Sequence, residues 1–347
     1  EIYKMINWWL DKGIAGFRID AIINIKKDLE WRSLPSDRDN GLVPVPESLV
    51  NAQPIEPFLQ ELKERTFAKY NAFTVGEVFN ETDDELHFFI GKDGVFSSIF
   101  DFKQTMLGQE GKGWFDHSLP TADELKESIF QAHERADSIG ALSTIIENHD
   151  EPRGVSHYIA EGPVNDTSKK ALGTIQVLRK GIPFIYQGQE IGMENQVFES
   201  VEDFDDIATI NGYHVAKEAG LSEEEALVAI ANYSRDNART PMQWSAEPGL
   251  GFSDGTAWLI SPKPNVAINV KDQEKDPNSI LNYYRQLTAL YRHPLYGNTI
   301  RFGDMIPAYR DRENIIAFER HGDKRLLVVN NFQNSQATLE LPAPIKT

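Results

Sequence analysis

The chain contains no cysteine among its 347 residues, and this absence excludes disulfide bonds and thiolate metal sites. It fits a reducing compartment, so the sequence predicts a cytoplasmic location. Basic residues are also scarce: 35 Lys and Arg stand against 53 Asp and Glu, and the formal net charge is −18. This balance argues against nucleic acid or an anionic membrane as a partner and suits a neutral substrate. No apolar run approaches the roughly 20 residues that a membrane-spanning helix needs.

Apolar side chains are plentiful enough for a large folded domain with a smaller one attached. Hydrophobic residues make up 40% of the sequence and aromatic residues 10%, which excludes a wholly disordered chain. Apolar residues at helical spacing predict a helix over residues 2–10 that ends at Gly13. A domain would not begin with the helix that leads into its central strand, and residue 1 is Glu. We therefore expect an N-terminal part of the protein to be missing from this chain, together with any targeting segment.

Strand-like and helix-like segments alternate along the first half of the chain. This order predicts βαβ units, and therefore an α/β fold with a parallel sheet. Units of about 31 residues match those of an eight-stranded barrel, with two enlarged loops, one of them over residues 31–54. The expected strands are 13–22, 73–77, 95–102, 142–146 and 182–186, and the expected helices are 55–69, 122–137, 169–180 and 280–292.

The remaining sequence predicts two further features. Residues 190–270 form a long excursion, expected to cover the mouth of the barrel, with one clear helix that begins at a capping box of Ser222 and Glu225. From residue 297 the pattern changes to short alternating strands at 315–320, 324–332 and 337–341. The predicted domains are thus a catalytic part over 1–296 and an antiparallel β domain over 297–347, which we expect to be truncated.

Two charged residues lie within the first predicted strand. In an extended segment Arg18 and Asp20 share one face, while Phe17 and Ile19 share the other. Buried charges are costly unless they are paired or used in chemistry. One interpretation is a structural ion pair at the end of a buried strand. The other is an active-site carboxylate at the carboxyl end of a parallel barrel strand, where such folds place their chemistry.

Two more acids, Glu77 and Asp150, follow predicted strands. Each acid taken singly is better explained as a helix cap or an ion-pair partner, but three of them at strand ends indicate a site. Neighbouring carboxyl groups push their pKa values apart, so that one stays protonated while another is ionised. Glycoside cleavage with retention needs such a pair, about 5–5.5 Å apart. Arg18 would keep Asp20 ionised, and His149 could donate to sugar hydroxyls.

Five ordered motifs resemble the signature regions of the α-amylase family of glycoside hydrolases. They are residues 16–20 (GFRID), 76–78 (GEV), 147–150 (ENHD), 186–193 (YQGQEIGM) and 235–244 (RDNARTPMQW). The last two are similar to the oligo-1,6-glucosidase and α-glucosidase branch of the family. The resemblance implies that the chain is the C-terminal part, about strands four to eight, of a (β/α)8 TIM barrel, followed by the start of a small antiparallel all-β domain.

The resemblance also implies a role for each matching residue. Asp20 would be the nucleophile, Glu77 the general acid and base, and Asp150 the acid that binds sugar hydroxyls and stabilises the transition state. Arg239 is expected to be a structural partner within its own segment. The residues expected to bind substrate are Arg18, which holds the nucleophile, His149, Arg235, which closes the pocket around a terminal glucose, and Glu151, which could face the leaving-group sugar.

Two departures from the family pattern bear on function. Relatives specific for α-1,6 bonds usually carry Val directly after the nucleophile, whereas this chain has Ala21. A difference of two methyl groups is worth about 1–3 kcal/mol of discrimination, and it favours α-1,4 bonds slightly. The family's first signature region has no counterpart here. We therefore expect the chain alone to be neither stable nor active, and its partner to be the missing N-terminal half.

The leading hypothesis is a retaining exo-acting α-glucosidase of short gluco-oligosaccharides that uses no metal and no organic cofactor in this part of the protein. One alternative is oligo-1,6-glucosidase or dextran glucosidase specificity. Another is a transglycosylating or isomerising relative, for which the same three carboxylates would serve. A third alternative, from a different class, is a catalytically inactive family member that acts as a binding or transporter-associated subunit.

Overall fold

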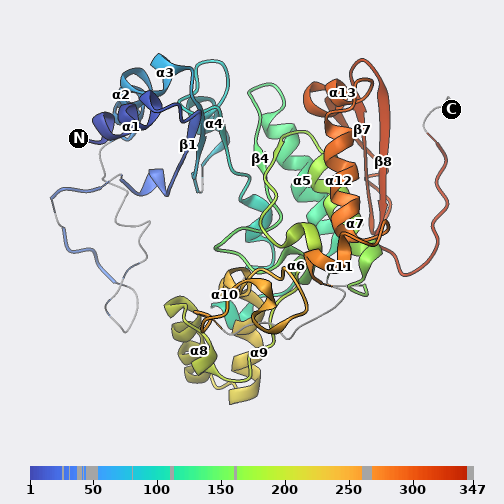
Figure 1. Ribbon diagram of the computed structural model, residues 1–347. Coiled ribbons are helices and arrows are strands. Elements are labelled where there is room, and N and C mark those ends of the chain that lie inside the picture. Colours follow the sequence, from blue (N-terminus) through green and yellow to red (C-terminus); the bar gives the residue numbers. More distant parts are fainter. Residues whose placement is uncertain are drawn as a thin grey trace. The chain divides into compact units, whose positions relative to one another are not determined.

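The computed structural model describes residues 1–25, 27–30, 32–36, 41, 43, 54–79, 81–109, 113–159, 162–259 and 268–341. Most of the loop expected over residues 31–54 lies outside them. The chain divides into two compact units, one made of residues 1–101 and 135–143 and the other of residues 102–134 and 144–347. Figure 1 traces both units along the sequence. Among the described helices, none is long and apolar enough to cross a membrane.

The first unit contains a parallel sheet in the order β1-β2-β3, formed by β1 (Gly16–Ile19), β2 (Phe73–Gly76) and β3 (Ser98–Ile99). Gly16 lies opposite Phe73 and Ile19 opposite Gly76, while β2 pairs with β3 in the same direction. The parallel pairing confirms the α/β prediction. The helices of this unit are α1 (Ile2–Asp11), η1 (Ile22–Ile25), α2 (Glu56–Arg65), α3 (Phe67–Tyr70) and α4 (Asp83–Phe89).

The first strand is less buried than its sequence predicts. Its four residues are half-buried or exposed, because among the described strands β1 stands at one end of the order β1-β2-β3 and pairs with β2 alone. The preceding helix α1 buries Ile6 and Leu10, whereas Trp8 and Met5 each keep 53% of their surface exposed. The interpretation of this segment as a buried strand is therefore wrong for the described structure.

The second unit has one large apolar core between helices and a sheet. The helices α5 (Ala122–Ala136), α6 (Gly154–Tyr158), α7 (Asp166–Leu178) and α12 (Ile280–Tyr291) contribute to it. Figure 1 shows α7 and α12 beside β7 and β8. Leu172, Leu287 and Phe318 meet in this core. Helix α7 begins three residues before the predicted start, because the Asn165 side chain accepts hydrogen bonds from the first free N–H groups of the helix.

The antiparallel sheet of the second unit has the order β6-β7-β8, with β6 (Asp304–Ala308), β7 (Ile315–His321) and β8 (Arg325–Asn331). The two predicted strands at 315–320 and 324–332 are confirmed. The strand predicted at 337–341 is wrong, since those residues have no regular structure. An alternating pattern is not sufficient, because a strand also needs a hydrogen-bonded neighbour. β6 was not predicted, because it contains Pro307 and lies at the sheet edge.

The excursion holds more helices than the one predicted. Helix α9 (Glu223–Tyr233) begins at the expected capping box of Ser222 and Glu225. It packs against α8 (Ile207–Glu218), which the sequence prediction missed. The other described helices are short: η3 (Lys103–Met106), η4 (Trp114–Asp116), η5 (Gln189–Ile191), η6 (Val201–Asp203), α10 (Asp236–Arg239), η7 (Pro248–Gly251), α11 (Val270–Gln273) and α13 (Gly297–Phe302).

Candidate active site

Two of the predicted acids directly follow neighbouring parallel strands of the first unit. Asp20 comes one residue after β1 and Glu77 one residue after β2, and the last residues of the two strands, Ile19 and Gly76, lie opposite each other. The Glu77 N–H donates a hydrogen bond to the Ile19 carbonyl, at 2.9 Å. Since parallel strands end at the same edge of a sheet, this register places both carboxylates together.

Arg18 binds both of these acids. Its Nη1 donates to Asp20 Oδ1, and its Nη2 lies 2.6 Å from Glu77 Oε1. The Glu77 side chain is buried, with 7% of its surface exposed, whereas 76% of the Asp20 side chain is exposed. The ion pair considered as the alternative interpretation is thus present, but Arg18 shares it with a second carboxylate. The Arg18 guanidinium therefore joins the two predicted acids directly.

Ala21 completes the contacts of Glu77. Its backbone N–H donates to Glu77 Oε2 at 2.6 Å, and its φ angle of +40° lies in the left-handed region. A residue other than glycine rarely adopts this conformation, which costs about 1–2 kcal/mol. The turn directs the N–H of Ala21 toward Glu77, so both oxygens of this carboxylate are held by residues of β1 or its end.

The third predicted acid, Asp150, lies in a cluster of basic side chains within the second unit. Its Oδ1 accepts hydrogen bonds from Arg235 Nη1 at 3.0 Å and from Arg239 Nη2 at 2.8 Å. Its Oδ2 lies 3.0 Å from His149 Nε2. The structure therefore brings together three of the predicted site residues, Asp150, His149 and Arg235.

Arg239 joins this cluster, contrary to the prediction of a partner within its own segment. Besides its bond to Asp150, its Nε donates to the His149 carbonyl at 2.9 Å. A sequence signal for this existed. Arg235 and Arg239 are four residues apart around the short helix α10, and residues at this spacing lie on one helix face. Two arginines on one face indicate a shared anionic partner, here Asp150.

A buried ion pair fixes the loop that carries Asp150. Arg153 and Glu147 are each 1% exposed, and Arg153 Nη1 donates to Glu147 Oε1 at 2.9 Å. Arg153 also donates to the Gln187 carbonyl at 2.8 Å and to the Asn237 carbonyl at 3.2 Å. It therefore ties together three of the motif segments, 147–150, 186–193 and 235–244. Burial raises the pKa of Glu147, and the charge of Arg153 opposes this shift.

Comparison with known proteins agrees with these motifs. Residues 1–295 match the family model described as the alpha amylase catalytic domain. The chain belongs to the α-amylase family. The family expected from the five motifs is therefore confirmed.

Relatives in the α-amylase family include several named glucosidases. The chain is 39% identical over 293 residues to the probable oligo-1,6-glucosidase 3 of Bacillus subtilis, covering 83% of this chain and 52% of that protein. It is 36% identical over 347 residues to the oligo-1,6-glucosidase of Halalkalibacterium halodurans, covering 99% and 61%. A crystal structure of Bacillus licheniformis trehalose-6-phosphate hydrolase has a TM-score of 0.85 at 31% identity, covering 99% and 61%. The chain thus spans between half and two thirds of these relatives.

Glu151, beside Asp150, has a carboxyl group with a shifted pKa. Burial of the group raises its pKa to about 7, and the negative charge of Asp150 acts in the same direction. A hydrogen bond with the Thr105 side chain and the charge of Arg235 lower it in part. A carboxyl group with a pKa near 7 is half protonated at neutral pH, so it can donate as well as accept a hydrogen bond.

The Glu151 shift predicts a pH dependence of stability. The folded state holds the proton up to about pH 7, whereas the unfolded state releases it near the ordinary value of 4.5. Stability is therefore expected to fall as pH rises from 5 to 8. After discounting for partial exposure, the contribution is on the order of 1–2 kcal/mol. Urea unfolding of Glu151→Gln at pH 5.5 and pH 8 should show a weaker pH dependence than wild type. The exposed Glu218→Gln serves as control, and an unchanged pH dependence in Glu151→Gln contradicts the assignment.

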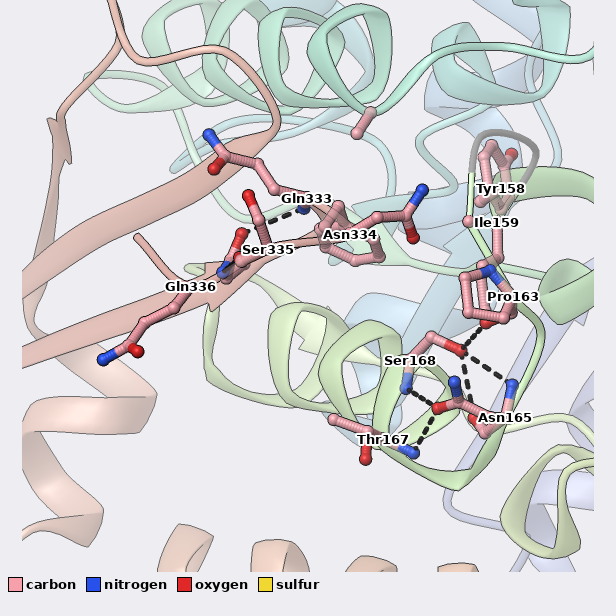
Figure 2. Close-up of a pocket in the computed structure, with 14 residues that line it drawn as sticks. Tyr158, Ile159, Pro163, Asn165, Thr167, Ser168, Gln333, Asn334, Ser335 and Gln336 are labelled. Atoms are coloured by element: carbon pink, nitrogen blue, oxygen red, sulfur yellow. Dashed lines mark hydrogen bonds between the residues drawn. The ribbon is translucent and has the colours of Figure 1, made fainter. Parts of the chain in front are cut away.

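A separate cavity of about 430 Å³ lies in the second unit, away from the family motifs. Figure 2 shows the hydrogen bonds among Asn165, Thr167 and Ser168 at the start of α7, on one side of this cavity. Residues 331–336, from the last residue of β8 onward, line the other side. None of the predicted site residues lines it. Within the described ranges, no group of three or more His, Asp and Glu side chains is arranged to hold a metal ion.

Proposed function

We propose that the chain carries the reacting groups of a retaining, exo-acting α-glucosidase that releases terminal glucose from short gluco-oligosaccharides. The observation that carries the proposal is the pair of carboxylates, Asp20 and Glu77, on one guanidinium at the ends of neighbouring parallel strands. Retaining glycosidases use two adjacent carboxyl groups, one as nucleophile and one as acid and base. Membership of the α-amylase family supports the same chemistry.

In the proposed mechanism Asp20 attacks the anomeric carbon of the terminal glucose. The glycosidic bond breaks, its electron pair goes to the leaving oxygen, and Glu77 gives that oxygen its proton. In the second step Glu77 removes a proton from water, the water oxygen bonds to the anomeric carbon, and the Asp20 carboxylate leaves. The exposure of Asp20 fits the role of nucleophile. Asp20 is exposed to a ligand, whereas Glu77 is buried and held at both oxygens.

We assign the Asp150 cluster to binding of the sugar hydroxyls. A carboxylate accepts hydrogen bonds from hydroxyl groups, while His149 and Arg235 donate them. Arg235 keeps 33% of its side chain exposed and Asp150 37%, so both remain accessible to a ligand. Arg235 would enclose a terminal glucose, and Glu151 would face the sugar that leaves.

We propose further that the active protein contains barrel strands beyond those of this chain, so that the chain corresponds to the C-terminal part of a (β/α)8 barrel over 1–296 and the start of a β domain over 297–347. The exposed apolar side chains of α1 and the free edge of β1 support this, because such surfaces are normally covered. The chain also spans only 52–61% of its relatives. The partner in this proposal is the N-terminal half. The absence of cysteine supports a cytoplasmic location.

Linkage preference is the finer part of the proposal. The small side chain of Ala21, next to the proposed nucleophile, leaves room near the scissile bond and favours α-1,4 over α-1,6 slightly. Similarity to proteins named oligo-1,6-glucosidase supports the alternative, α-1,6 specificity. Similarity to a crystal structure of a trehalulose synthase, with a TM-score of 0.83 and 31% identity, supports an isomerising alternative.

One substrate panel tests the proposal and both alternatives. The complete protein, including the N-terminal half, is assayed on maltose, isomaltose, sucrose and p-nitrophenyl α-glucoside, with products separated by chromatography. Release of α-glucose with a higher kcat/KM for maltose is the expected result. A higher kcat/KM for isomaltose favours the α-1,6 alternative, and a disaccharide product from sucrose favours isomerisation. No product from any of the four contradicts the proposed activity.

A further inference from the structure

Arg235 lies between two carboxylates, only one of which belongs to the family motifs. Its Nη1 donates to Asp150 Oδ1, and its Nε lies 3.0 Å from Asp206 Oδ1. Asp206 is 6% exposed, so its charge is costly unless it is paired and hydrogen-bonded. It is located in the excursion, 29 residues before Arg235 along the chain. Sequence reasoning gave it no role.

Both side-chain oxygens and the backbone N–H of Asp206 have partners. Its Oδ2 accepts from the Thr209 N–H at 2.9 Å and from the Thr209 hydroxyl at 2.8 Å, and it thereby caps the N-terminus of α8. Its own N–H donates to Oδ2 of Asp236, which also accepts from the Asp205 N–H. Asp236 is the neighbour of Arg235 in sequence. The segment before α8 and the segment around Arg235 therefore hold each other.

We propose that Asp206 is a positioning residue that holds the Arg235 guanidinium against Asp150. A guanidinium is planar, so a partner at Nε fixes the direction in which the Nη groups point. Asp206 also balances charge. Asp150 alone faces two arginines, Arg235 and Arg239, and the second carboxylate compensates one of them. Asp206 thus makes the excursion part of the sugar site without touching the sugar. This inference rests on the proposed function, because it needs Asp150 and Arg235 to bind substrate.

Asp206→Asn separates the two tasks of the side chain. Asn is as good an N-cap as Asp, so α8 keeps its first hydrogen bonds. The charge opposite Nε of Arg235 is lost, however, and a guanidinium held through Nη1 by Asp150 alone can rotate. We expect kcat/KM for the preferred disaccharide to fall about 10-fold, mostly through KM, because Arg235 holds the sugar in the ground state as well.

A double-mutant cycle shows whether Asp206 acts through Arg235. If it does, adding Asp206→Asn to Arg235→Ala should change kcat/KM less than twofold, since the group to be positioned is already gone. Additive losses in the double variant overturn the proposal. Ser222→Ala is the matched control, because it removes the N-cap of the adjacent helix α9 without touching Arg235. It should lower the thermal midpoint and leave KM unchanged. If Ser222→Ala raises KM as much as Asp206→Asn does, the proposal is also overturned.

A second readout does not depend on activity. With ¹⁵N-arginine labelling, the Nε–H resonance of Arg235 is assigned by its loss in Arg235→Lys. Asp206→Asn is expected to shift this resonance and to speed its exchange with water, while Ser222→Ala leaves it in place. An unchanged Nε–H resonance overturns the positioning role. If no substrate is turned over but the resonance responds as expected, the proposed glucosidase function fails and the structural coupling of Asp206 to Arg235 stands.

Discussion

Replacing Asp20 by Asn is expected to lower kcat for glucoside hydrolysis by at least about 10³-fold, because the amide cannot form the covalent glycosyl intermediate. A loss of this size corresponds to about 4 kcal/mol of transition-state stabilisation. The measurement is the rate of glucose release by the complete protein from its preferred disaccharide.

The thermal stability of Asp20→Asn distinguishes a nucleophile from a structural ion-pair partner. The Asp20 side chain is 76% exposed, and an exposed ion pair contributes only about 0–1 kcal/mol. Asp20→Asn should therefore keep the thermal midpoint of wild type within a few degrees while it loses activity. Asp84→Asn, another exposed acid in the same unit, should leave both quantities unchanged. Full activity of Asp20→Asn contradicts the nucleophile assignment.

Local patterns were sufficient to place the two acids of the first unit. Asp20 and Glu77 each end a short apolar segment, and parallel pairing then brings both to one edge of the sheet. The number of neighbours around β1 does not follow from this pattern, so its partial exposure was not predicted.

The partner of Arg239 and the formation of helix α8 could not be predicted from the sequence, because both depend on contacts between distant segments. Arg239 reaches Asp150 across 89 positions, and only the folded chain shows that its partner lies there. Helix α8 has Gly212 near its centre, which lowers helix propensity. The helix forms because Asp206 caps it and α9 packs against it. Both facts depend on residues outside the local window, and both concern the excursion that carries Arg235.

The second large effect is expected for Glu77→Gln. A positioned acid and base contributes about 10²–10⁴-fold, so hydrolysis of maltose or isomaltose should slow by that factor. Substrates with different leaving groups show whether formation or hydrolysis of the glycosyl intermediate is slowed. p-Nitrophenolate leaves without a proton, so formation of the glycosyl intermediate from p-nitrophenyl α-glucoside should be much less impaired. Hydrolysis of the glycosyl intermediate needs Glu77 as base and should become rate-limiting. A burst of p-nitrophenol should therefore precede a slow steady state.

Azide then tests the base role of Glu77 directly. It is a nucleophile that carries no proton to be removed, so it should attack the intermediate in Glu77→Gln, restore turnover and give α-glucosyl azide with retention. Wild type should gain little, because water is already activated there. Glu64→Gln, at an exposed acid of helix α2, is the control and should behave as wild type. No burst and no azide rescue in Glu77→Gln would show that Glu77, although bound to the same guanidinium as Asp20, serves only to hold Arg18 and the turn at Ala21.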